Sequence, residues 1–169
     1  MIIGFMGTGK TAVGMKLAEK LEYRFVDTDR WIEKEMSKTI PEIFGQEGEP
    51  YFRDLEERVV QEASGLTGAV ISTGGGVVVR PENIRRLKAG AFMVSLKATP
   101  EVIYERIRKE GPRPLLQAED PLDAIRQLLR TREESYSRAD LILDTSTLDV
   151  DRVVEKIIDG YKRHRQEGS

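Results

Sequence analysis

The residues best suited to chemistry lie near the start of the chain, where residues 4–11 read GFMGTGKT. This segment matches the pattern G-x-x-x-x-G-K-[ST] in full, in which glycines let successive backbone N–H groups point into one concavity that suits phosphate oxygens. The helix expected to begin near Lys10 adds its positive N-terminal end. We expect Lys10 to reach the outer phosphates of a nucleotide and the Thr11 hydroxyl to ligate magnesium. An incidental Lys-Thr pair after a glycine turn is the alternative. The residues predicted to bind the nucleotide here are Gly7, Thr8, Gly9, Lys10, Thr11 and Ala12.

Two acidic residues, Asp27 and Asp29, follow the second apolar run of the chain. A metal–phosphate site needs acidic residues close to it, and a hydroxyl acceptor needs a carboxylate that orients it or accepts its proton. Both carboxylates are expected to face the phosphate loop from the end of a neighbouring strand. The alternative is that Asp29 simply caps a short helix over residues 30–36.

A phosphate loop alone does not separate a kinase from a GTPase or a motor ATPase. The sequence has no N-K-x-D-like segment that would read guanine, and the strand expected at residues 69–72 does not end in an aspartate. The short chain also suits a metabolite or nucleotide kinase. Two other readings stay open, namely a kinase for another small acid or sugar such as gluconate, and a regulatory protein that binds ATP without turnover.

The composition is that of an ordinary globular domain of 169 residues, with 39% hydrophobic and 33% charged residues. The net charge of −2 provides no basic field for nucleic acid or an anionic membrane. No apolar run approaches the roughly 20 residues that span a bilayer. The chain has no cysteine, which excludes a disulfide scaffold and is compatible with a reducing compartment. We expect a cytoplasmic monomer, with no nucleic-acid or membrane partner.

Short apolar runs alternate with helical stretches along the chain. Strands are predicted near residues 1–3, 23–26, 69–72, 92–96 and 141–143, and helices over 10–21, 31–36, 49–64, 81–90, 99–109, 122–135 and 150–163. This order predicts an α/β fold, a three-layer α/β/α arrangement of one domain (1–169) around a five-stranded parallel sheet. In such sheets ligands bind beyond the carboxyl ends of the strands, which is where the phosphate loop, the two aspartates and Gly74–Gly76 fall.

These motifs together resemble those of the shikimate kinase family, a P-loop kinase family with the fold of nucleoside-monophosphate kinases. The phosphate loop, the Asp-x-Asp pair, Phe52-Arg53 with Glu56, the triple glycine and Arg113-Pro114-Leu115-Leu116 occur in that family's order and spacing. The resemblance covers nearly the whole chain. It implies transfer of the γ-phosphoryl of ATP, with Mg²⁺, to the 3-hydroxyl of shikimate.

On the acceptor side, the resemblance implies that Asp29 binds the ring hydroxyls and orients the one that attacks. Arg53 would pair with the substrate carboxylate, for which a guanidinium fork is suited, and Glu56 would hold Arg53 in its rotamer. Gly74, Gly75 and Gly76 would let backbone amides come close to substrate and phosphate. Asp27 would stand in the outer shell of the magnesium ion on Thr11.

Three arginines complete the expected site. Arg113 lies in the segment that resembles the family's mobile lid (about 111–120) and would close onto the phosphates. Arg106 would stack on adenine. Arg132 is the second carboxylate-binding candidate, with Tyr136 at the family's spacing of four, although Glu133-Glu134-Ser135 between them departs from the usual proline and leucine.

Overall fold

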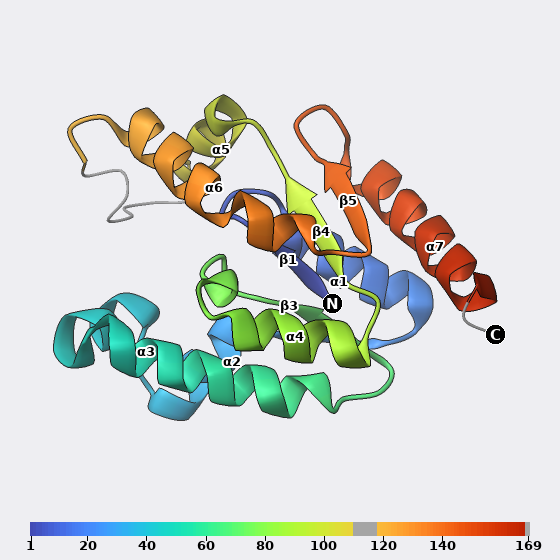
Figure 1. Cartoon of the computed structure of the whole chain (residues 1–169), viewed down its shortest axis with the longest axis horizontal. Coiled ribbons are helices and arrows are strands. Elements are labelled where there is room, and N and C mark those ends of the chain that lie inside the picture. The colour runs from blue at the N-terminus through green and yellow to red at the C-terminus, as the bar shows by residue number, and fades with distance from the viewer. Residues whose placement is uncertain (110–117, 168–169) are drawn as a thin grey trace.

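The protein is built around a five-stranded sheet in which every neighbouring pair of strands is parallel. A computed structural model describes residues 1–109 and 118–167 (Figure 1). The strands are β1 (Ile2–Gly4), β2 (Arg24–Asp27), β3 (Ala69–Ser72), β4 (Val94–Lys97) and β5 (Leu141–Asp144), in the order β2-β3-β1-β4-β5. The predicted fold class, a five-stranded parallel α/β sheet, is confirmed.

Helices cover both faces of the sheet, because alternate residues of each strand carry apolar side chains to opposite faces. The helices are α1 (Lys10–Leu21), α2 (Thr28–Met36), α3 (Ile40–Ser64), α4 (Pro81–Gly90), α5 (Pro100–Ile107), α6 (Pro121–Ser137) and α7 (Val150–Glu167). Ile2 packs with side chains of α1 and α7 on one face. Its neighbour Ile3 packs with side chains of α3 and α4 on the other. Figure 1 shows these helix layers on the two sides of the strands.

Several elements differ from the sequence-based expectation. The helix expected over 49–64 matches the second segment of α3, and a first segment, which begins at Ile40 with Thr39 as its cap, precedes it and ends at a break at Gly48 (φ 84°). The last helix continues to Glu167, well past the expected end at 163. A short 3₁₀ helix (Val77–Val79), which the sequence did not reveal, follows the triple glycine. No helix among the described residues is long and apolar enough to cross a membrane.

The strand order brings the three candidate loops to one edge of the sheet. β3 lies between β2 and β1, with Asp27 in register with Ser72 and Ile2 also in register with Ser72. The backbone continues this pairing past the strand, since Thr73 N donates to Ile2 O at 3.1 Å. Because all three strands run the same way, their carboxyl ends place the phosphate loop, the two aspartates and the triple glycine side by side.

Candidate active site

The phosphate loop curls through two glycines in the left-handed region, Gly7 (φ 74°) and Gly9 (φ 88°), which residues with a Cβ rarely enter. The Thr8 hydroxyl donates to Phe5 O at 2.7 Å and closes the turn. The Lys10 ammonium folds back over the loop and donates to the same Phe5 carbonyl at 2.8 Å. Lys10 is buried, so its charge is held in the concavity of the loop. This is the location in which the sequence placed a phosphate-binding lysine.

Two side chains from distant segments, Arg106 and Thr145, form hydrogen bonds to backbone carbonyls of the phosphate loop. Arg106 Nη1 donates to Gly7 O at 3.1 Å, and its Nη2 donates to Thr145 O at 2.7 Å. The Thr145 hydroxyl lies 3.0 Å from Thr8 O and 3.1 Å from Arg106 Nη1. Sequence reasoning missed Thr145, whose only signal is a polar residue just after the last strand. The guanidinium of Arg106 therefore supports the loop backbone, and its stacking on adenine stays a prediction.

Asp27 and Thr11 lie next to each other at the mouth of the loop. The Thr11 hydroxyl donates to Asp27 Oδ2 at 3.3 Å. Asp27 Oδ1 accepts from the backbone N–H groups of Asp29 and Arg30 at 3.1 and 3.3 Å. Asp27 is thus the N-cap of α2, and the alternative that gave this role to Asp29 is wrong, because α2 begins at Thr28.

The oxygens of Thr11 and Asp27 are hard ligands of the type that Mg²⁺ takes. Among the described residues no group of three or more His, Cys, Asp or Glu side chains gathers as a metal cage. A site with few protein ligands fits a magnesium ion that is held largely by phosphates and water. These residues therefore fit a nucleotide-bound Mg²⁺.

Asp29 lies in the first turn of α2 and points its carboxyl group at the triple glycine. Its Oδ1 is buried and has no hydrogen-bond partner among the described residues. A Cβ on Gly74 would lie 2.4 Å from this oxygen, so only glycine admits the carboxyl here. Burial, and then the charge of Asp27, raise the pKa of Asp29 to about 6, although Lys10 and Arg53 act in the opposite direction. An unpartnered carboxyl of this kind is suited to receive a hydroxyl.

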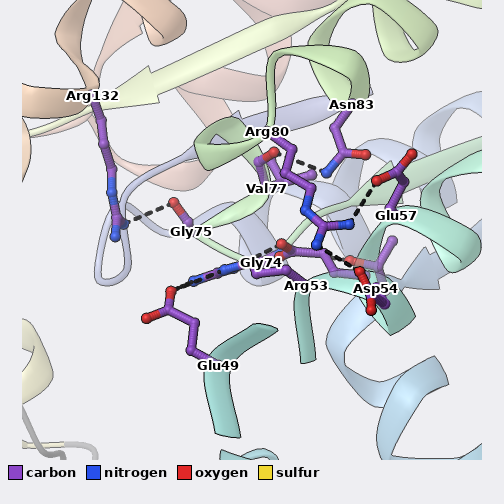
Figure 2. Close-up of polar contacts among 12 residues, drawn as sticks. Glu49, Arg53, Asp54, Glu57, Gly74, Gly75, Val77, Arg80, Asn83 and Arg132 are labelled. Atoms are coloured by element: carbon purple, nitrogen blue, oxygen red, sulfur yellow. Dashed lines mark hydrogen bonds and ion pairs between the residues drawn. The ribbon is translucent and has the colours of Figure 1, made fainter. Parts of the chain in front are cut away.

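Arg53 comes from α3 and lies flat against the glycine loop. A Cβ on Gly76 would lie 2.3 Å from Arg53 Nη1, so the guanidinium occupies the space that any side chain would need. Nη1 donates to Glu56 Oε2 at 2.7 Å, as expected from their spacing. Nε and Nη2 both donate to Glu49 Oε1, at 3.1 and 2.9 Å (Figure 2). Sequence reasoning missed Glu49, although its place one helical turn before Arg53 was a signal.

Glu56 is buried beneath Arg53, with 1% of its side chain exposed. Burial raises the pKa of Glu56 to about 7, while the charge of Arg53 works against this rise. Its second oxygen, Oε1, has no hydrogen-bond partner in the part of the chain that the structure describes. Glu56 therefore holds Arg53 from the interior side of the site.

Arg132 and Tyr136, one turn apart on α6, both bind the middle glycine. Arg132 Nη1 donates to Gly75 O at 3.1 Å, and the Tyr136 hydroxyl donates to the same oxygen at 2.7 Å. The guanidinium of Arg132 also lies over the ring of Phe5, 5.6 Å from its centroid. The acidic neighbours of Arg132 in the sequence do not capture it in any described contact. In Figure 2 Arg132 reaches Gly75 from one side of the glycine loop, and Arg53 lies on another.

The structure thus brings the phosphate loop, Asp27, Asp29, Arg53, the triple glycine and Arg132 together, and Arg106 supports the loop from its other side. Lys10 and Arg53 oppose the rise in the pKa of Asp29, and Arg132 opposes the rise in that of Glu56, because these positive charges lie close to the two carboxyl groups. Arg113 and most of the expected lid lie outside the described residues. The cluster combines a phosphate cradle, a buried carboxyl and two arginines, a set that can bind an anionic molecule and present its hydroxyl to a phosphate.

Comparison with known proteins points to one family. A model of the shikimate kinase family matches residues 6–162. The shikimate kinase of Caldanaerobacter subterraneus subsp. tengcongensis is 47% identical over 161 residues, covering 95% of this chain and 94% of that one. The solved structure of shikimate kinase from Acinetobacter baumannii in complex with shikimate superposes with a TM-score of 0.88 at 37% identity, covering 93% of this chain and 88% of that one. A gluconokinase from Sinorhizobium meliloti 1021 reaches 0.58 at 19% identity, covering 98% and 92%, and shares the fold alone.

Proposed function

The chain belongs to the shikimate kinase family, and from this premise we propose that the loop cluster around Lys10 and Asp29 is its active site. The reaction is phosphorylation of the 3-hydroxyl of shikimate by ATP, giving shikimate 3-phosphate and ADP, in the biosynthesis of chorismate and aromatic amino acids. The observation that carries the site assignment is the buried Asp29 oxygen without a partner, which faces the glycine loop close to Lys10 and Arg53.

On the nucleotide side, the backbone N–H groups of residues 7–12 would hold the phosphates of ATP. Lys10 would leave its contact with Phe5 O and follow the charge that develops on the transferring group. Arg106 and Thr145 would keep the loop in shape during this change, because they bind carbonyls on its outer side. Most of the stabilisation then comes from positioning and charge rather than from covalent chemistry.

On the acceptor side, Asp29 would accept a hydrogen bond from the 3-hydroxyl and fix its direction of attack. As the new bond forms between the hydroxyl oxygen and the γ-phosphorus, the bond to the β–γ bridging oxygen breaks and the hydroxyl proton leaves. Asp29, whose buried Oδ1 has no partner among the described residues, is a carboxylate that could take up this proton. Arg53 and Arg132 would fix the ring by its carboxylate, a geometry suited to guanidinium groups.

We propose that Mg²⁺ binds with the nucleotide at Thr11, with Asp27 in its outer shell. When bound it neutralises charge on the β- and γ-phosphates. Asp27 is already oriented for this, since its Oδ1 is fixed by the α2 backbone and its Oδ2 faces the Thr11 hydroxyl.

Arg113 and the 111–120 segment would close over the phosphates and exclude water. The protein would act in the cytoplasm as a single-domain monomer whose partner is shikimate, without binding nucleic acid or a membrane.

A coupled ADP-release assay with Mg-ATP tests the function and the site together. Shikimate is compared with gluconate and nucleoside monophosphates as acceptors. We expect turnover with shikimate alone, lost in Asp29→Asn. Arg53→Gln should mainly raise KM for shikimate, and Lys10→Met should mainly lower kcat. Turnover of another acceptor in preference to shikimate would refute the substrate assignment, and equal effects of both variants on KM alone would refute the division of roles.

A further inference from the structure

Glu49 is a charged residue of this site that the roles above leave unexplained. Its Oε1 accepts from two nitrogens of Arg53, Nε at 3.1 Å and Nη2 at 2.9 Å, so it occupies one whole edge of the guanidinium. On the other side of the guanidinium, Arg53 Nη1 donates to Glu56 Oε2. Figure 2 shows the Glu49 carboxylate at the end of the Arg53 side chain. A substrate carboxylate that approaches Arg53 therefore meets a carboxylate already in place.

The two acidic partners of Arg53 differ in how easily they can leave. The Glu56 side chain is 1% exposed and is held in the interior, whereas the Glu49 side chain is 58% exposed. A carboxylate at the surface regains its hydration when it turns outward, but a buried one does not. Glu49 also follows the break at Gly48, at the start of the second segment of α3. Glu49 is thus the partner that a ligand can displace.

The charges of the cluster explain why this matters for an anionic substrate. The cations Lys10, Arg53 and Arg132 are matched in number by the carboxyl groups of Asp29, Glu49 and Glu56. A second carboxylate beside Glu49 is repelled unless Glu49 withdraws. A neutral acceptor meets no such repulsion.

From these contacts we infer that Glu49 competes with the substrate carboxylate for Arg53 and so determines how strongly the site binds a carboxylate acceptor. This inference rests on the proposed role of Arg53. Substrate binding exchanges one ion pair of Arg53 for another, and the net affinity is the difference between the two. The exchange changes KM and leaves the phosphoryl-transfer step alone, because Glu49 contacts neither the phosphate loop nor Asp29 in any described hydrogen bond.

The test is Glu49→Gln, which keeps the shape of the side chain and removes its charge. We expect KM for shikimate to fall about 2- to 5-fold, the range of a partly exposed ion pair, with kcat unchanged. The neutral carboxamide of shikimate should show no fall in KM. The matched control is Glu62→Gln, which breaks an exposed pair of the same i,i+4 spacing, Arg58 Nη1 to Glu62 Oε1 at 3.1 Å, and should leave both constants unchanged.

A double-mutant cycle separates competition from a general structural effect. In an Arg53→Gln background, Glu49→Gln should no longer change kcat/KM for shikimate. Three outcomes would each overturn the inference. They are a KM for shikimate that rises or stays unchanged in Glu49→Gln, a KM for the carboxamide that falls equally, and a change in kcat/KM that persists in the Arg53→Gln background. Failure of the proposed function looks different: wild-type protein would not turn over shikimate, or Arg53→Gln alone would leave its KM unchanged, and the inference would fall with its premise.

Discussion

The ionised carboxyl group of Asp29 should lower the free energy of unfolding, and a variant with an uncharged side chain at this position should be more stable. Burial and the neighbouring charge of Asp27 raise its pKa from 3.8 to about 6. Lys10 and Arg53 oppose this rise without cancelling it. A shift of about 2 pKa units corresponds to about 3 kcal/mol at 1.36 kcal/mol per unit. The folded state therefore tolerates the ionised carboxyl less well than the unfolded state does.

The direction of the pH dependence follows from the raised pKa. Between pH 3.8 and 6 the folded state binds the proton more tightly than the unfolded state, so stability is lost as pH rises through this window. At neutral pH the full cost is present. Asp29→Asn has nearly the same shape and no charge. Its free energy of unfolding should exceed that of the wild type by about 3 kcal/mol above pH 7, or about 6–12 °C in Tm for a chain of this size. The same variant should lack phosphoryl transfer.

Urea unfolding of both proteins at neutral pH and near pH 4 measures this difference. The gain should shrink to a small fraction of its neutral-pH value near pH 4, where folded Asp29 is almost fully protonated and unfolded Asp29 is close to half protonated. Asp144→Asn supplies a control of opposite sign, because hydrogen bonds from Ser146 hold the pKa of Asp144 below its usual value. That variant should lose stability at neutral pH. An Asp29→Asn protein that is no more stable than the wild type at neutral pH, or equally stabilised near pH 4, would refute the reasoning.

Two further predictions concern the glycine loop. Gly76→Ala places a methyl group 2.3 Å from Arg53 Nη1 and must displace the guanidinium, so KM for shikimate should rise about 10- to 100-fold in steady-state assays; an unchanged KM would remove Arg53 from the binding site. Tyr136→Phe removes the hydroxyl bound to Gly75 O, and urea unfolding should show a loss of about 1 kcal/mol together with a lower kcat/KM. Loss of stability with kcat/KM intact would limit Tyr136 to a structural role.

The sequence predicted the phosphate loop and the sheet because both depend on local pattern. The spacing of Gly4, Gly9 and Lys10 is sufficient to define the loop, and short apolar runs between helices are sufficient to indicate parallel strands. Because ligands bind beyond the carboxyl ends of parallel strands, the two aspartates and the triple glycine were expected at one edge of the sheet without any knowledge of strand order. The structure confirms the fold class on which that step relied.

What the sequence did not reveal are mainly contacts between segments far apart in the chain. Thr145 supports the phosphate loop across 137 positions, and Arg106 across 99. The position of Thr145 after a predicted strand does not indicate which backbone carbonyl its hydroxyl will bind. Glu49 is a different case, because it lies one turn from Arg53 and its role depends on the rotamer that the fold gives to that arginine. The assignment of the α2 cap also needed the true helix start, one residue beyond Asp27.

The three residues of the triple glycine are accounted for by their contacts and not by backbone conformation. None of its three residues has a positive φ, so the freedom of the glycine backbone does not explain them. Each instead faces a different neighbour. Gly74 faces Asp29 and Gly76 faces Arg53 at distances that a Cβ could not keep, and Gly75 faces Met6 N of the phosphate loop at 3.0 Å, which is tighter than most Cβ contacts. The glycine loop is therefore a surface against which three parts of the site pack: the carboxyl group of Asp29, the phosphate loop and the guanidinium of Arg53. A single added methyl group at any of the three positions should disturb a different one of these parts, which makes this loop the element that couples the two halves of the site.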